Sequence, residues 1–310
     1  MHVYFVRVHH LQGAKVTEKC SSIAAMTIQQ AYQQLLLQLY ELYNNREAAN
    51  IADMVIEHVT GQRKIERIMY KDLPVHEQQQ NMLSGLSREL LQHKPVQYVL
   101  HEAWFCGLKF YVDEHVLIPR PETEELVEWV EEECKTQNSK FKILDIGTGS
   151  GCIPISLKKQ LPAAEIMGID VSAGALNVAF KNAQLLNLQV DFKQVDFLNE
   201  NERDVLELYN IIVSNPPYIK ANEEATMHAN VLAFEPHVAL FVPDNNALVF
   251  YEAIALFGKK HLTPGGKIFL EINEALGEQV VELFTNTGYK NVTLKKDMQG
   301  KDRMVGCEFV

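Results

Sequence analysis

Short apolar segments alternate with longer amphipathic segments from residue 121 to the end of this 310-residue chain. Such alternation is typical of a parallel sheet with helices on both faces. The expected strands are 141–146, 165–170, 190–195, 210–214 and 267–272, and the expected helices are 122–135, 152–160, 173–187, 247–261 and 275–287. Residues 290–295 and 303–309 predict a closing hairpin at one sheet edge. The predicted fold class is therefore α/β, with a seven-stranded, doubly wound, Rossmann-like sheet.

The first 120 residues follow other patterns. Between Thr27 and Gln97 apolar residues recur at three- and four-residue spacing, which predicts a small bundle of helices. Residues 103–118 alternate around Gly107 and an Asp113–Glu114 turn, which predicts a β-hairpin. We divide the chain into a disordered extension (1–26, with Met26 as a natural start), a helical domain (27–98), a β-hairpin connector (99–120) and the α/β domain (121–310).

The charge of the chain bears on its partners. Forty acidic residues against 29 basic ones give a net charge of -11. Residues 101–310 hold 31 acids and 19 bases, a net charge of -12, so the α/β part carries the excess. Binding to a long nucleic acid normally requires a basic surface, so such a partner is not expected. No uninterrupted apolar run reaches the length of about 18 residues that a membrane span needs.

Cysteine and histidine usage argues against disulfides and metal sites. The five cysteines are odd in number and form no C-x-x-C pair, and the eleven histidines form no H-E-x-x-H motif. Residues 1–25 lack the apolar core of a secretory signal, and we expect a cytoplasmic protein. These residues carry three basic side chains against one acid, so an organelle-targeting role for them stays open.

A glycine-rich turn follows the strand expected at 141–146. The segment Lys142–Gly151 reads K-I-L-D-I-G-T-G-S-G, with three glycines at alternate positions. Glycines in such a turn let a ligand approach the backbone closely. The dinucleotide fingerprint G-x-G-x-x-G would need a glycine where Cys152 stands. The pattern instead resembles the first motif of S-adenosylmethionine-dependent methyltransferases, which suggests that Asp145 helps to hold the charged amino-acid end of the cofactor. The cofactor-binding candidates here are Asp145, Gly147, Thr148, Gly149, Ser150 and Gly151.

Acidic residues also end the next two expected strands. Asp170 follows Gly151 by 19 residues, a place from which a carboxylate accepts hydrogen bonds from ribose hydroxyls. The alternative is a helix N-cap for a helix beginning near Ser172. Asp196 and Phe197 close the third strand. The Asp196 carboxylate could accept a hydrogen bond from an adenine amino group, and the Phe197 ring could stack on the adenine. The alternative is that Asp196 is only an acid at a strand end and Phe197 only a core aromatic.

The fourth strand ends in Asn215-Pro216-Pro217-Tyr218. Two prolines fix the backbone and leave carbonyls free to accept hydrogen bonds. The Asn215 oxygen and the Pro216 carbonyl suit the two hydrogens of a planar NH₂ group, and the ring of Tyr218 offers a face for stacking. The motif resembles the fourth motif of amino-methyltransferases. These enzymes modify the exocyclic amines of adenine or cytosine, or the side-chain amide of glutamine. Asn215, Pro216 and Tyr218 are our catalytic candidates, and Asn215 is also a cofactor-binding candidate.

Several further segments resemble the HemK family of protein-(glutamine-N5) methyltransferases. They are residues 94–98 (KPVQY), 104–110 (WFCGLKF), 116–124 (VLIPRPETE) and 235–240 (EPHVAL). The resemblance covers residues 27–310 and excludes residues 1–26. It implies that the Arg120 segment lies at the active-site rim. The alternative is that Pro-Arg-Pro is an exposed, rigid entry to an acidic helix with Thr123 and Glu124 in its first turn. The substrate-binding candidates are Asn215, Pro216, Pro217, Tyr218, Arg120 and Thr123.

The resemblance to this family also implies an activity. It suggests methyl transfer from S-adenosylmethionine to the glutamine amide nitrogen in the Gly-Gly-Gln motif of class I peptide chain release factors, with S-adenosylhomocysteine as the product and no metal. The helical domain would help to recognise the protein substrate. Two alternatives remain: an adenine-N6 nucleic-acid methyltransferase, and a non-catalytic module that binds S-adenosylmethionine or a release factor.

Overall fold

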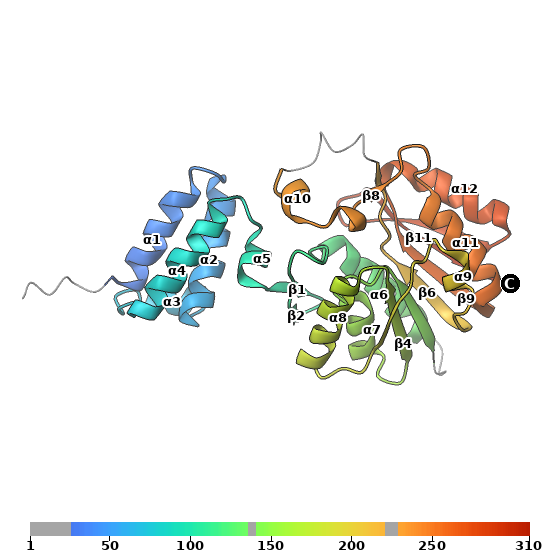
Figure 1. Cartoon of the computed structure of the whole chain (residues 1–310), viewed down its shortest axis with the longest axis horizontal. Coiled ribbons are helices and arrows are strands. Elements are labelled where there is room, and N and C mark those ends of the chain that lie inside the picture. The colour runs from blue at the N-terminus through green and yellow to red at the C-terminus, as the bar shows by residue number, and fades with distance from the viewer. Residues whose placement is uncertain (1–25, 136–140, 221–228) are drawn as a thin grey trace, which may run out of the picture. The chain divides into compact units, whose positions relative to one another are not determined.

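The structure is a computed structural model that describes residues 26–135, 141–220 and 229–310 (Figure 1). Apart from Met26, the extension predicted for residues 1–26 lies outside the described residues. The chain divides into two compact units, residues 1–84 and 85–310. The division into four parts proposed from the sequence places the end of the helical domain at residue 98, and it stays a prediction.

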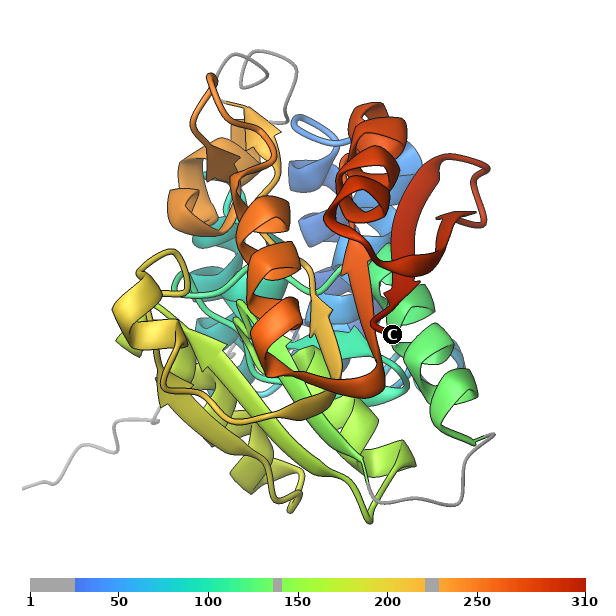
Figure 2. The same cartoon turned by 90° about the vertical axis from the view of Figure 1, so that its right-hand side faces the viewer.

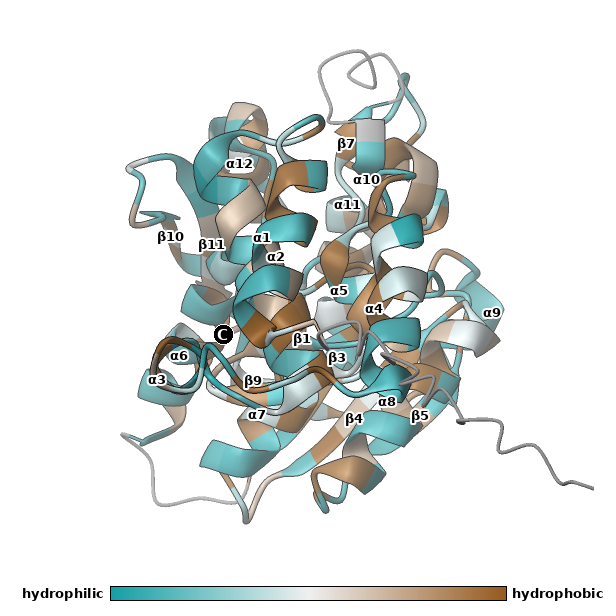
Figure 3. Cartoon of the chain, turned by 90° about the vertical axis from the view of Figure 1, so that its left-hand side faces the viewer, coloured by the Kyte–Doolittle hydropathy of each residue, from teal (hydrophilic) through white to brown (hydrophobic). Residues whose placement is uncertain are grey.

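The described part of the first unit is helical. Its helices are α1 (Ile28–Leu39), α2 (Asn45–Thr60), α3 (Lys64–Met69) and α4 (Glu77–Leu90), which runs on into the second unit. Helix α1 begins with a capping box in which Thr27 and Gln30 bind each other's backbone N–H groups. Helix α2 is followed by Gly61, whose φ of 71° makes it a left-handed C-cap. Apolar and polar residues alternate along α1 and α2, as Figure 3 shows.

The second unit opens with a short helix and a hairpin. Helix α5 (Val96–Leu100) precedes strands β1 (Ala103–Phe105) and β2 (Leu108–Phe110), which pair in antiparallel fashion. The turn is Cys106–Gly107, where both residues have positive φ. The hairpin predicted over residues 103–118 is therefore too long, because the backbone from Tyr111 to Ile118 forms no strand.

The α/β sheet has the seven strands that were predicted. In spatial order they are β10 (Lys290–Lys296), β11 (Asp302–Glu308), β9 (Leu262–Glu271), β6 (Tyr209–Ser214), β3 (Lys142–Ile146), β4 (Glu165–Asp170) and β5 (Asp191–Gln194). Strands β5, β4, β3, β6 and β9 run parallel. Strand β11 runs antiparallel to both of its neighbours, β9 and β10. The closing hairpin is thus confirmed, and its last strand lies inside the sheet rather than at the edge.

Helices cover both faces of the sheet. Figure 2 shows α11 and α12 on the viewer's side. The helices of this unit are α6 (Pro121–Lys135), α7 (Cys152–Gln160), α8 (Ala173–Leu185), α9 (Glu200–Arg203), α10 (Ala229–Phe234), α11 (Val249–His261) and α12 (Gly277–Thr287). Short 3₁₀ turns cover His237–Ala239 and Glu274–Leu276, and β7 (Ile219–Lys220) pairs in parallel with β8 (Phe241–Val242). The sequence predicted neither of these two strands.

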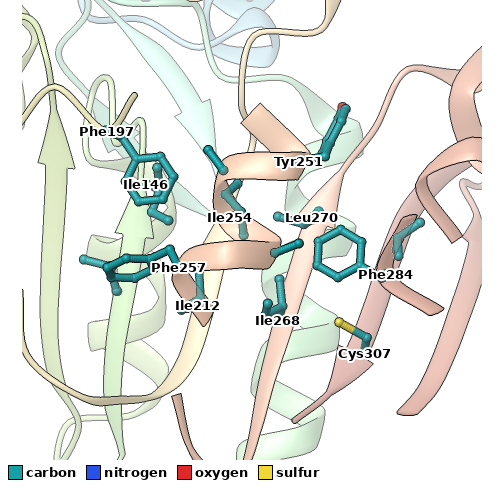
Figure 4. Packing of buried hydrophobic residues seen from close by; sticks show 14 of the residues in the cluster. Ile146, Phe197, Ile212, Tyr251, Ile254, Phe257, Ile268, Leu270, Phe284 and Cys307 are labelled. Carbon is teal, nitrogen blue, oxygen red and sulfur yellow. The ribbon is translucent and has the colours of Figure 1, made fainter. Parts of the chain in front are cut away.

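Successive strand residues supply two separate cores. On one face Ile212, Ile268 and Leu270 pack with Phe257 of α11 and Phe284 of α12 (Figure 4). On the other face the core joins α6 and α7 to strand residues Ile143, Ile211, Val213 and Phe269. Because side chains alternate along a strand, these runs of apolar residues feed both faces, as a doubly wound sheet requires. The predicted fold class is confirmed.

Candidate functional site

The glycine turn joins β3 to α7 and bends over the end of β4. The N–H groups of Gly147 and Thr148 both donate to the carbonyl of Ile169, each at 2.9 Å. Gly147, Gly149 and Gly151 have φ values of 73°, 52° and 77°, a region that L side chains rarely adopt.

The three glycines face different surroundings. A Cβ on Gly147 or Gly149 would meet no atom within 4 Å, and both residues line a cavity. A Cβ on Gly151 would meet Ile155 at 3.0 Å and Ala179 at 3.1 Å. The first two glycines therefore leave backbone open toward the cavity, whereas Gly151 permits close packing of α7 and α8.

We call this space the glycine-loop cavity. It lies at the carboxyl ends of β3, β4, β5 and β6, where ligands of open α/β sheets bind. Its walls include six of the predicted cofactor-binding residues: Gly147, Gly149, Asp170, Asp196, Phe197 and Asn215. Pro217 also lines it, and the wall does not include Asp145, Thr148, Ser150 or Gly151.

Asp170 is held by backbone donors at the cavity wall. Its Oδ2 accepts from Gly149 N and its Oδ1 accepts from Ser172 N, both at 2.9 Å. The N-cap of α8 is Ser172, whose hydroxyl accepts from Ala175 N, so Asp170 is not itself the cap. Burial raises the pKa of Asp170, and the backbone N–H groups oppose this shift. The carboxylate is thus fixed in orientation by two backbone donors, and Asp170 lines the cavity.

Asp196 and Phe197 follow β5. The Asp196 carboxylate accepts from Leu198 N at 3.0 Å, which closes a local turn. Phe197 is 5% exposed and packs edge-on against Phe257, with the ring centroids 5.3 Å apart. Each of the two residues thus has a local structural contact and also lines the cavity.

Asp145 is buried beneath the turn in β3. It has no exposed surface, and neither carboxylate oxygen has a hydrogen-bond partner of acceptable geometry among the described residues. Burial raises the pKa of Asp145 to about 7, and the nearby Thr148 hydroxyl opposes the shift only in part. A buried acid without a partner directly under a ligand cavity is unusual, because such groups normally find one.

A second cavity adjoins Asn215, and we call it the Arg120 cavity. It is lined by Leu117, Arg120, Asn215, Pro216, Tyr218, Ile219, Val231, Ala239, Leu240 and Glu271. Asn215 lines both cavities, as do Leu117 and Ala239. Asn215 therefore borders both spaces.

Two buried polar side chains, Thr123 and Glu271, form hydrogen bonds to the Asn-Pro-Pro-Tyr turn. Asn215 Nδ2 donates to Thr123 Oγ1 at 3.1 Å, and the Tyr218 hydroxyl donates to Glu271 Oε1 at 3.1 Å. Thr123 is 2% exposed and lines neither cavity. Burial raises the pKa of Tyr218 well above its usual value, so the phenol keeps its proton.

Arg120 reaches its cavity with a buried partner. Its guanidinium contacts Glu235 Oε1 at 2.5 Å, and Glu235 Oε2 accepts from Ile118 N at 3.3 Å. Glu235 is 3% exposed, whereas the side chain of Arg120 is 35% exposed. This ion pair joins two of the segments on which the sequence resemblance rests.

Sequence reasoning missed several residues that line the two cavities. The missed residues include Glu271, Leu117, Ala239, His115 and Phe250. Glu271 ends β9, so the rule that ligands bind at the carboxyl ends of parallel strands would have pointed to it. Among the described residues no group of three or more metal-ligating side chains occurs, and Cys106, Cys134, Cys152 and Cys307 are free thiols. In the same part of the chain no helix is both long and apolar enough to cross a membrane.

Comparisons with known proteins give the family. Residues 30–100 match the model of the PrmC N-terminal domain, and residues 123–238 match that of the methyltransferase small domain. A release factor glutamine methyltransferase of Flavobacterium psychrophilum is 42% identical over 286 residues, which cover 92% of this chain and all of that protein. The chain belongs to the release factor glutamine methyltransferase family. The family resemblance predicted from the sequence is thereby confirmed.

Other relatives agree with this assignment. A release factor glutamine methyltransferase of Bacteroides thetaiotaomicron is 40% identical, over 86% of this chain and 95% of its own. Among solved structures, the hMettl16 catalytic domain in complex with the MAT2A 3'UTR hairpin 6 has a TM-score of 0.53 at 18% identity. The match covers 76% of this chain and 82% of that one, and it shows the methyltransferase fold alone.

Proposed function

We propose that this chain methylates the side-chain amide nitrogen of a glutamine in a peptide chain release factor, with S-adenosylmethionine as the methyl donor. The observation that carries the proposal is the position of Asn215, which lines both the glycine-loop cavity and the Arg120 cavity. A methyl group must pass between donor and acceptor where their two sites meet. Membership of the family favours this function over a nucleic-acid methyltransferase and over a non-catalytic binding module.

The glycine-loop cavity fits the donor. Gly147 and Gly149 offer open backbone, and Asp170 lines the cavity, where it would accept hydrogen bonds from the ribose. Outside the cavity wall, Asp145 is a buried acid without a hydrogen-bond partner among the described residues. Asp196 and Phe197 suit the adenine end. When bound, S-adenosylmethionine supplies an electrophilic methyl group on a positively charged sulfur.

The residues around Asn215 would orient the acceptor. The Asn215 Oδ1 atom and the Pro216 carbonyl accept the two hydrogens of the glutamine NH₂ group, while the Tyr218 ring lies against the amide plane. Because an amide nitrogen is a weak nucleophile, alignment supplies much of the rate. The nitrogen forms a bond to the methyl carbon as the carbon–sulfur bond breaks and its electron pair stays on sulfur. The nitrogen then loses a proton to water, and the two acceptors stabilise its transient positive charge.

The substrate follows from family membership rather than from the shape of the cavity. We propose a class I release factor, modified at the glutamine of Gly-Gly-Gln, with Arg120 at the rim of the cavity. The net charge of -12 on residues 101–310 argues against a long nucleic acid as the partner.

The direct test uses a purified release factor. Incubation with the enzyme and S-adenosylmethionine should add one methyl group to the glutamine of Gly-Gly-Gln, as peptide mass spectrometry detects. A release factor with alanine at that glutamine is the control. An unmodified glutamine, or methyl label on nucleic acid instead, would contradict the proposal.

Asp170→Ala should weaken binding of S-adenosylmethionine by about 10- to 100-fold, because charge-assisted hydrogen bonds to the ribose are lost. Asp170→Asn keeps one acceptor oxygen and should lose less. Calorimetry measures both, and a thermal melt shows whether loss of the contact to Gly149 N also loosens the turn. Unchanged affinity in Asp170→Ala would refute the ribose assignment.

The helical first part of the chain would recognise the protein substrate. A fragment of residues 101–310 should then bind S-adenosylmethionine but methylate a release factor far more slowly than the whole chain. Circular dichroism and cofactor binding show whether the fragment is folded. A folded fragment that works at the full rate would refute the recognition role.

A further inference from the structure

Glu271 has the most unusual environment of the residues that line the Arg120 cavity. It is the last residue of β9, is 2% exposed and lies in the cavity wall. Its Oε2 accepts from the Thr123 hydroxyl at 2.6 Å and its Oε1 accepts from the Tyr218 hydroxyl at 3.1 Å. One buried carboxylate therefore binds side chains from α6 and from the turn after β6.

The chain of hydrogen bonds through Thr123 has a direction. A hydroxyl has one hydrogen, and that of Thr123 is given to Glu271. The Thr123 oxygen is left as an acceptor, which is the role it takes toward Asn215 Nδ2 at 3.1 Å. The Asn215 amide is thereby oriented with its NH₂ group toward Thr123 and its oxygen away from it.

This orientation matters for the reacting amide. A glutamine NH₂ group is a double donor, so it needs the oxygen of Asn215 and is repelled by its NH₂ group. The oxygen and nitrogen of an asparagine side chain have nearly the same shape, so packing alone selects between the two orientations poorly. The Thr123 oxygen, as a fixed acceptor next to the amide, selects the orientation in which the NH₂ group of Asn215 points toward it.

The pKa of Glu271 lies above its usual value, because burial outweighs the neighbours that favour the carboxylate. Burial raises its pKa, whereas the donors Thr123 and Tyr218 and the positive charge of Arg303 favour the ionised form. Glu122 acts in the opposite sense, as a like charge. Arg303 is itself held by Asp297, with Nε and Oδ2 3.1 Å apart.

We propose that Glu271 is a positioning residue. Through Thr123 it holds the Asn215 amide with its oxygen toward the substrate. Through its direct hydrogen bond to the Tyr218 hydroxyl it holds the Tyr218 ring against the substrate. The inference rests on the proposed function. It assigns no contact between Glu271 and the donor. It predicts that the Glu271–Thr123 pair acts on the methyl-transfer step and not on cofactor binding.

The test compares Glu271→Gln, Thr123→Val and the double variant, with kcat and KM measured on a release factor and cofactor affinity measured by calorimetry. Each single variant should lower kcat by about 10- to 100-fold, the worth of a hydrogen bond to a charged group, and leave the cofactor Kd within about threefold. Because both changes break one chain, the double variant should fall little further than the worse single one.

Conservative and distant variants complete the test. Thr123→Ser keeps the hydroxyl and should recover most of the turnover that Thr123→Val loses. Glu278→Gln changes an exposed glutamate on α12 and should leave kcat unchanged. Thermal melts of all the variants identify any that fail to fold, and in that case the comparison of Thr123→Ser with Thr123→Val decides.

The outcomes separate this inference from the proposed function. If Asn215→Ala is impaired, any of three results would overturn the role of Glu271. These are a parental kcat in folded Glu271→Gln, an equal kcat in Thr123→Ser and Thr123→Val, and independent effects of the two changes in the double variant. If Asn215→Ala also has parental kcat, the assignment of Asn215 fails and the inference falls with it.

Discussion

Replacing Asn215 by alanine should lower turnover on a release factor by about 10²–10³-fold, while the Kd for S-adenosylmethionine changes by less than about tenfold. The reason is that Asn215 lines both cavities. Its oxygen would align the glutamine nitrogen and stabilise the charge that develops there, and neither contribution is needed to hold the donor. Steady-state kinetics and calorimetry on the same preparation measure the two quantities.

Asn215→Asp is the sharper variant. It keeps the size of the side chain but removes the donor that binds Thr123 and places a second carboxylate near Glu271. If negative charge near the sulfonium were what accelerates the reaction, turnover would rise. We expect it to fall, because the amide must be oriented and neutral to present a single, well-placed oxygen.

Asn201→Ala, which changes an exposed residue of helix α9, is a matched control that should have parental kinetics. Near-normal turnover of both Asn215 variants on a Gly-Gly-Gln substrate would remove this residue from the mechanism. A parallel loss of cofactor affinity would instead place Asn215 in the donor site.

The sequence predicted the sheet well because its signals are local. Strands β3 and β6 contain short apolar runs, and the glycines after Ile146 and the prolines after Asn215 mark their ends. The pairing of β7 with β8 was missed because each strand has two residues, too few for any period to appear. The predicted hairpin was too long because apolar residues continue after Phe110. These residues, which include Val112 and Val116, lie in irregular backbone and pack against α8.

The candidate site was predicted less completely because its supports are distant in sequence. Thr123 and Glu271 are 148 residues apart and meet only once α6 and β9 are packed together. Gly151 stays a predicted cofactor-binding residue, but it does not line the glycine-loop cavity, and a Cβ there would meet Ile155 and Ala179. Sequence spacing identifies a turn, but the fold decides which of its residues face the cavity.

Asp145 should make the stability of the free protein depend on pH. Burial raises its pKa from 3.8 to about 7, so between these values the folded state keeps a proton that the unfolded state releases. Its contribution to stability is therefore full below pH 3.8 and is lost as the pH rises through about 7. Above that pH, the buried charge costs roughly 4 kcal/mol at most, since one pKa unit is worth about 1.4 kcal/mol.

Asp145→Asn removes the charge and should stabilise the free protein at pH 8.5 by roughly 1–4 kcal/mol, with a much smaller difference at pH 5. Denaturant unfolding at the two pH values measures this difference. Asp191→Asn, an exposed residue of β5, should show no such dependence on pH. An equal effect of Asp145→Asn at both values would show that Asp145 does not titrate in this range.

The same substitution tests what Asp145 does for the donor. If the carboxylate holds the positively charged amino-acid end of S-adenosylmethionine, binding must favour its ionised form and release a proton near pH 6.5. Calorimetry in two buffers of different ionisation enthalpy should detect that proton with the parent protein. Asp145→Asn should bind more weakly and release none, so a variant more stable than the parent would be the poorer binder. Equal proton release from both proteins would show that the ammonium group is held elsewhere.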